Sequence, residues 1–129
     1  MSAPSLLGSA GDLLPDMVRI RRAMHAHPEV GLHLPATRGL VVAELESMGI
    51  EVHTHERTSG VVGVIPGDGP AVLLRADMDA LPMPEDTGLG FASGNGAMHA
   101  CGHDLHTAML LGAARLLVER RSELSGPVL

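Results

Sequence analysis

Apolar residues recur with a helical period in three stretches of the chain. In residues 12–27 they fall on one side of the predicted helix, and most of the arginines fall on the other. Pro28 is expected to end this helix, because the residue before a proline avoids helical dihedral angles. The pattern predicts a second helix over residues 35–48, capped by Gly49, and a third, rich in Leu and Ala, over residues 104–121.

The stretches between these helices are predicted to form strands and turns. Residues 50–55 alternate as a half-buried strand does, and residues 60–65 predict a second strand. Residues 66–70 form a Pro/Gly turn, which leads into a short apolar strand over 71–74. Residues 83–96 are expected to be a loop, and residues 128–129 to open a further strand. This order of elements predicts an α/β fold, with residues 1–11 as a flexible leader and residues 12–129 as part of one domain.

Composition narrows the class of protein. A length of 129 residues suits one domain or part of one, and Phe91 is the only aromatic residue, which suggests a core that lacks packing partners. The net charge of −6 argues against a nucleic-acid partner, and no apolar run approaches the roughly 20 residues that span a bilayer. A single cysteine excludes an internal disulfide, and the first residues lack the pattern of a signal peptide. These features predict a cytoplasmic protein.

The densest chemistry lies in residues 98–106, which hold three histidines, one aspartate and the only cysteine. Cys101 and His103 can reach one point if the chain bends between them, and Gly102 permits that bend. A thiolate and an imidazole together bind Zn²⁺ or a similar divalent ion. The alternative is a buried free cysteine beside a histidine at the start of a helix.

Two carboxylates precede this motif. Asp77 and Asp79 follow the predicted strand over residues 71–74, and α/β sheets place their sites at the carboxyl ends of strands. One of them can orient a histidine ligand while the other accepts a proton or steadies the metal site. The alternative is a solvated loop in which one aspartate caps a helix.

The remaining histidines are expected to have structural roles. His106 shares a helix face with His103, so a supporting contact or helix packing is expected there, with a metal contact as the alternative. The same expectation holds for His99. Four further histidines are predicted to lie in a structural turn or in solvent: His25 and His27 at the end of the first helix, and His53 and His55 on a strand.

Four linked motifs make the chain resemble the M20 peptidase family, in the branch of hippurate hydrolases, N-acyl-amino-acid amidohydrolases and auxin-conjugate hydrolases. The motifs are residues 27–31, 75–82, 88–93 and 98–107, in the order and near the spacing of that family. The resemblance implies the N-terminal portion of a zinc-exopeptidase-like, three-layer α/β/α catalytic domain, truncated before its C-terminal half and its inserted dimerisation domain. Residues 32–35 lack the acidic residues common there, which concerns helix packing more than chemistry.

The resemblance also implies a site. Cys101 and His103 would be two of five protein ligands of a centre of two divalent ions (Zn, Mn, Co or Ni), with Cys101 bridging them. Asp79 would be the catalytic aspartate, which orients a metal ligand or supports the base. The general base would be a glutamate of a Glu-Glu pair, and neither that pair nor the remaining ligands lie within residues 1–129.

The implied activity is metal-dependent hydrolysis of the amide bond of N-acyl amino acids or small peptides, within a longer parent that forms a homodimer or homotetramer. The fragment alone would be inactive. Two alternatives remain: a non-catalytic metal-binding module, and a truncated fragment whose motifs are relics. A reading frame that continues past Leu129 into a Glu-Glu pair and two well-separated histidines would favour the enzyme.

Overall fold

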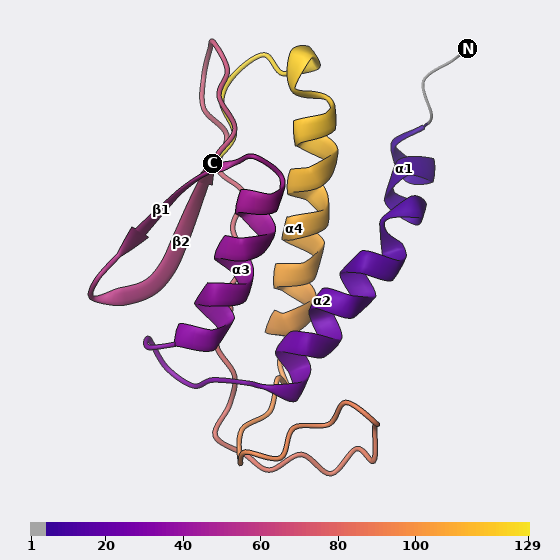
Figure 1. Ribbon diagram of the computed structural model, residues 1–129, viewed down its shortest axis with the longest axis vertical. Helices are drawn as coiled ribbons and strands as arrows, with labels where there is room; N and C mark the ends of the chain where they lie inside the picture. The colour runs from indigo at the N-terminus through magenta and orange to yellow at the C-terminus, as the bar shows by residue number, and fades with distance from the viewer. Residues whose placement is uncertain (1–4) are drawn as a thin grey trace.

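The computed structural model describes residues 5–129, and Figure 1 shows helices packed side by side with a small sheet beside them. This arrangement confirms the predicted α/β class, and the three helices predicted from periodicity are present. The elements in chain order are α1 (Leu6–Asp12), α2 (Leu14–Ala26), α3 (Pro35–Ser47), β1 (Glu51–His55), β2 (Thr58–Val64), α4 (His103–Glu119) and the 3-10 turn η1 (Arg121–Glu123).

The core lies where α2, α3 and α4 meet and where α3 covers the sheet. It contains no aromatic side chain and is filled by aliphatic residues, as the composition predicts. Each helix buries one apolar stripe, and these stripes contribute to a common core. This packing fixes the position of the start of α4. The buried members are Ile20, Met24, Val41, Leu45, Ile50, Ile65, Ala108 and Leu111.

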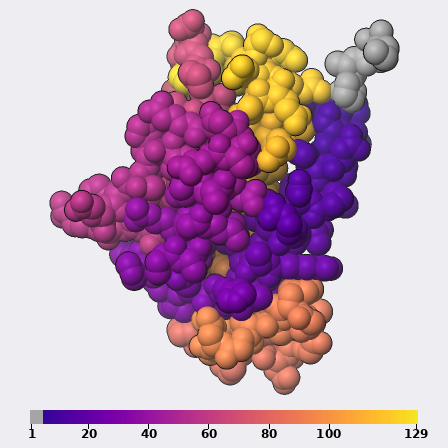
Figure 2. All heavy atoms as spheres, in the orientation of Figure 1, coloured from indigo at the N-terminus to yellow at the C-terminus, as the bar shows by residue number. Residues whose placement is uncertain are grey.

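The predicted strands at residues 50–55 and 60–65 are confirmed as β1 and β2, which pair antiparallel with Glu51 opposite Val64. Gly49 ends the preceding helix in a left-handed conformation, with φ +72°, as expected of a C-terminal glycine. The hairpin projects from the side of α3 (Figures 1 and 2).

The expected leader is helical where the structure describes it. Within the predicted flexible segment 1–11, α1 begins after Ser5, whose hydroxyl oxygen accepts a hydrogen bond from the Gly8 amide at 3.1 Å. A serine at this position supplies the partner that a helix N-terminus lacks, so a short helix forms despite its glycines. Residues 1–4 lie outside the described part, and the domain boundary at residue 12 stays a prediction.

The prediction of a regular strand over residues 71–74 is wrong. This stretch is extended, but it makes only a single parallel bridge, between Val72 and Val128. Val128 also bridges Ile65 in the antiparallel sense, so residues 127–129 lie between two extended segments. The turn at Gly69 passes directly over Gly126, where a Cβ on either residue would collide with a backbone carbonyl. Pairing with so short a partner leaves no ladder from which a strand can form.

Residues 83–97 form a long loop without helix or strand, as predicted, apart from a bridge beside it between Leu81 and Met98. Figures 1 and 2 show this loop, in orange, beneath the end of α2 and the start of α4. Within residues 5–129, no helix has the length and apolar character needed to cross a membrane.

Candidate metal centre

The candidate site lies where the extended residues 77–81 pass the first turns of α4. Three contacts fix this segment. The Ala80 amide donates to the main-chain oxygen of Glu29 at 2.8 Å, and Leu81 pairs with Met98 through two 2.9 Å backbone hydrogen bonds. The hydroxyl of Thr107 donates to the main-chain oxygen of Asp77 at 3.0 Å. The two aspartates are therefore held against the helix that carries His103.

Asp79 orients the ring of His103. The Nδ1 atom of His103 lies 2.9 Å from the main-chain oxygen of Asp79 and 3.0 Å from its carboxylate Oδ1. A carbonyl oxygen can only accept, so Nδ1 must carry the proton and donate it. In a neutral ring the lone pair then belongs to Nε2, which is the arrangement of a metal-binding histidine held by a carboxylate.

Asp77, His103 and His106 bring three potential ligand atoms together, all within 4.8 Å of one another. Nε2 of His103 lies 3.5 Å from Asp77 Oδ2, and Nδ1 of His106 lies 2.8 Å from Asp77 Oδ1. The two imidazole rings stack with their centroids 5.5 Å apart. The hydrogen bond from His106 is the largest influence that lowers the pKa of Asp77, so this carboxylate is ionised at neutral pH.

These donors fit a divalent ion. The lone pair of His103 Nε2 and the Asp77 carboxylate converge on the same space, and two acceptors so placed repel each other unless a cation or a proton lies between them. Imidazole nitrogens and carboxylate oxygens are the ligands that Zn²⁺ and similar ions take in hydrolytic sites. Partial exposure, 21% for the side chain of His103 and 30% for that of Asp77, leaves the space open on one side.

Cys101 is an exposed free thiol in the loop just before α4, and it does not belong to the three-residue cluster. Gly102 has φ +82°, which is the bend expected between Cys101 and His103. The predicted buried free cysteine is therefore excluded, because the thiol faces solvent. The joint role of Cys101 and His103 as metal ligands stays a prediction.

Sequence reasoning missed the pairing of His106 with Asp77. A supporting contact of His106 with His103 was expected, and their stacking agrees, but the carboxylate partner comes from 29 residues earlier in the chain. The three-residue spacing of the two histidines was the available signal. His53 and His55 are exposed, as predicted.

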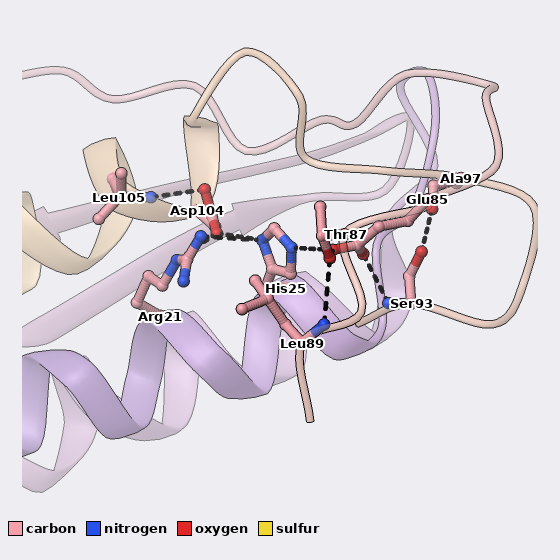
Figure 3. A network of polar contacts seen from close by, with 9 residues as sticks. All are labelled: Arg21, His25, Glu85, Thr87, Leu89, Ser93, Ala97, Asp104 and Leu105. Atoms are coloured by element: carbon pink, nitrogen blue, oxygen red, sulfur yellow. Dashed lines mark hydrogen bonds and ion pairs between the residues drawn. The ribbon is translucent and has the colours of Figure 1, made fainter. Parts of the chain in front are cut away.

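A second polar cluster lies behind the start of α4 and was not anticipated. His25, expected in a structural turn, is buried between Asp104 and Glu85, and Figure 3 shows its ring between the two carboxylates. His99 is also buried, and neither of its ring nitrogens has a hydrogen-bond partner among the described residues. Burial lowers the pKa of His99, which favours a neutral ring.

The comparisons with known proteins agree with the fold. Residues 73–129, which contain the whole candidate centre, match the profile of peptidase family M20/M25/M40. The chain is 49% identical over 95% of its length to IAA-amino acid hydrolase ILR1-like 4 of Arabidopsis thaliana. It is 45% identical over 87% of its length to N-acetylcysteine deacetylase of Bacillus subtilis. It covers 28% and 30% of these two relatives, respectively.

Two crystal structures share the fold. One is described as an aminohydrolase of methicillin-resistant Staphylococcus aureus, with a TM-score of 0.90 and 40% identity, over 95% of this chain and 32% of that one. The other is a dinuclear metal-binding peptidase of the M20 family from Bacillus subtilis, with a TM-score of 0.86 and 42% identity, over 92% of this chain and 34% of that one. The chain belongs to the M20 family, a family of hydrolases, and it spans about 30% of the length of the curated relatives it matches.

Proposed function

We propose that this chain supplies part of the metal centre of an amidohydrolase that cleaves the amide bond of N-acyl amino acids or small peptides. Relatives named for the hydrolysis of IAA-amino acids and the deacetylation of N-acetylcysteine support this substrate class. Both names describe an acyl group joined to an amino acid. A structural neighbour described as a dinuclear metal-binding peptidase supports two divalent ions as the cofactor.

The observation that carries the proposal is the orientation of His103. Asp79 accepts a hydrogen bond from the Nδ1–H of His103, and the lone pair on Nε2 faces Asp77 across 3.5 Å. His103, Cys101 and Asp77 are the residues of this chain that would hold the ions, with Asp79 as the residue that fixes the imidazole. When bound, the ions would acidify a water molecule and stabilise the negative charge that develops on the amide oxygen.

Residues 1–129 are not expected to supply the general base of this reaction. Their sequence contains no Glu-Glu pair, and the M20 resemblance places the general base in such a pair. We therefore expect the isolated chain to bind metal without turning over substrate, and hydrolysis to require the rest of a longer polypeptide.

The test compares two proteins: the 129-residue chain and the longest polypeptide that its reading frame encodes. Both are loaded with Zn²⁺ or Mn²⁺ and incubated with N-acetyl and N-benzoyl amino acids, and the free amino acid is measured. Turnover by the longer protein alone, lost on chelation, is the expected result. Turnover by the 129-residue chain that disappears in Cys101→Ala would overturn the expectation that this chain binds metal without hydrolysing substrate. Metal-independent turnover by the longer protein would overturn the proposed function.

A non-catalytic metal-binding module is the second candidate, because one specific observation favours it. Asp77, His103 and His106 bring three ligand atoms together without any residue from outside the chain. This reading predicts stoichiometric metal binding and no hydrolysis even in the longest encoded polypeptide, so the same pair of assays separates the two candidates.

A further inference from the structure

Side-chain contacts hold the loop over residues 83–97 against the end of α2, and the local sequence pattern does not predict them. The carboxylate of Glu85 accepts a hydrogen bond from the Ser93 amide at 2.6 Å, and its other oxygen lies 2.9 Å from Nε2 of His25. Phe91 packs edge-on against the His25 ring, with centroids 5.5 Å apart, and lies 5.1 Å from the guanidinium of Arg21. The loop is therefore anchored through His25.

The other side of the His25 ring faces α4. Its Nδ1 lies 2.7 Å from Oδ2 of Asp104, a side chain with no exposed surface, directly after His103. Asp104 also accepts from Nε of Arg21 at 2.7 Å and, through Oδ1, from the Leu105 amide at 2.9 Å. Both oxygens of Asp104 are therefore engaged, Oδ2 by His25 and Arg21 and Oδ1 by the Leu105 amide.

Glu85 is ionised. The hydroxyl of Thr87, the Ser93 amide and His25 together bring the pKa of Glu85 to about 2. A neutral imidazole has one N–H, so one of its nitrogens would direct a lone pair at a carboxylate within 3 Å. Two N–H groups remove that repulsion, and the cluster then holds two positive and two negative charges, which is how charges are accommodated in a protein interior.

We propose that His25 is a positioning residue of the candidate metal centre: protonated on both ring nitrogens, it joins Asp104 at the start of α4 to Glu85 of the 83–97 loop. Its effect on catalysis rests on the function proposed above, whereas its effect on structure and metal binding does not. The groups that face its ring are Arg21 from α2, Asp104 from α4, Glu85 and Phe91 from the loop, and His99 with its centroid at 6.4 Å.

The geometry of α4 explains why this matters for His103. The helix begins after Gly102, which has no side chain to cap it. Asp104 supplies a side-chain acceptor in the first turn, and His25 and Arg21 hold that acceptor in place. Without His25, Asp104 and Glu85 would lose their common partner, and the turn that carries His103 would lose its connection to the loop.

The first measurement is spectroscopic. In the ¹⁵N-labelled 129-residue chain at pH 7.5, NMR of the imidazole nitrogens is expected to show both nitrogens of His25 protonated. In Glu85→Gln, the amide can donate to Nε2, so His25 should retain only the proton on Nδ1. A singly protonated His25 in the unaltered chain would overturn the proposal, and so would an unchanged, doubly protonated ring in Glu85→Gln.

The second measurement follows the consequences for the loop and the metal. In His25→Gln, exchange of the Ser93 amide hydrogen is expected to accelerate by about tenfold or more, and Zn²⁺ affinity measured by calorimetry to fall by about 10- to 100-fold. The matched control is His27→Gln, two residues away and exposed, which should change neither quantity. Glu85→Gln is the second variant if His25→Gln does not fold.

The two proposals fail separately. Unchanged Zn²⁺ affinity in both His25→Gln and Glu85→Gln would overturn the positioning role, whatever the enzyme assay shows. A doubly protonated His25 with weakened Zn²⁺ binding in the variants would support it, even if no amide is hydrolysed by the longest encoded polypeptide.

Discussion

His103 meets Asp79 twice through one atom: its Nδ1 lies 2.9 Å from the main-chain oxygen and 3.0 Å from the carboxylate of the aspartate. The main-chain contact sets the tautomer, because a carbonyl can only accept, and the carboxylate adds basicity to the ring. An amide at residue 79 would preserve the first effect and weaken the second. Tautomer and basicity can therefore be separated by a single substitution.

In the longest encoded polypeptide, Asp79→Asn should lower hydrolytic activity far more than metal content, because the main-chain oxygen still orients the ring. Cys101→Ser should lower metal content and activity together, because the thiolate is proposed as a ligand. Elemental analysis beside the amidase assay measures both. Asp86→Asn, an exposed acid in the neighbouring loop, is the matched control. Equal metal loss in Asp79→Asn and Cys101→Ser would place Asp79 among the ligands.

Glu29 is predicted to stabilise α3. Its carboxylate accepts from the amides of Thr37 at 2.7 Å and Ala36 at 3.2 Å, at a helix start where Leu34 provides no side-chain cap. Glu29→Ala should lower the free energy of unfolding by about 1 kcal/mol, the usual value of a lost cap, as measured by urea denaturation. The exposed Glu46→Ala on the same helix should change it by less than half as much. Equal losses in the two variants would show that Glu29 does not act as a cap.

Acid should weaken the attachment of the loop over residues 83–97 as the pH falls below 4.5. The pKa of Glu85 is about 2 in the folded chain against an ordinary value of 4.5. Because the folded value is the lower one, the stabilisation is present above pH 4.5 and is lost as the pH falls from 4.5 towards 2. Glu85→Gln should therefore lower the unfolding temperature at pH 7, and the difference from the unaltered chain should narrow across that window. A constant difference from pH 7 to pH 2.5 would show that the charge of Glu85 is not involved.

An apolar groove of about 600 Å³ runs between β2, α4 and residues 73–79, and its lining includes Leu73, whose side chain is 69% exposed. Exposed apolar patches seek partners, so the isolated chain should self-associate in a concentration-dependent way. Leu73→Glu should shift light scattering towards the monomer. Leu7→Glu, at a leucine of α1 that is 84% exposed and lies outside the groove, should not. A monomeric unaltered chain would contradict this prediction.

The elements that the sequence predicts well are those whose pattern is local. The ends of α2, α3 and α4 lie within two residues of the predicted ranges, because each helix carries its own apolar stripe. The segment over residues 71–74 is as apolar as a buried strand, yet its structure depends on pairing with Val128, more than fifty residues later. No local pattern contains that information.

The candidate site shows the same difference between local patterns, which the sequence reveals, and contacts with distant residues, which it does not. The motif residues Asp79 and His103 could be selected from their types and spacing, and the structure brings them into contact. The role of His25 could not, because its partners Asp104 and Glu85 lie 79 and 60 residues away in sequence. A buried histidine between two acids looks, in sequence, like an ordinary residue at the end of an amphipathic helix.

Titration of the chain with Co²⁺, followed by absorption spectroscopy, tests most directly the claim that Cys101 and His103 bind a divalent ion beside Asp77. The unaltered chain is predicted to show a thiolate-to-cobalt charge-transfer band, which Cys101→Ser should lose. His103→Ala should weaken binding by about tenfold or more. His53→Ala, an exposed histidine of β1, should change neither the band nor the affinity. Identical Co²⁺ titrations of the unaltered chain, Cys101→Ser and His103→Ala would contradict the account.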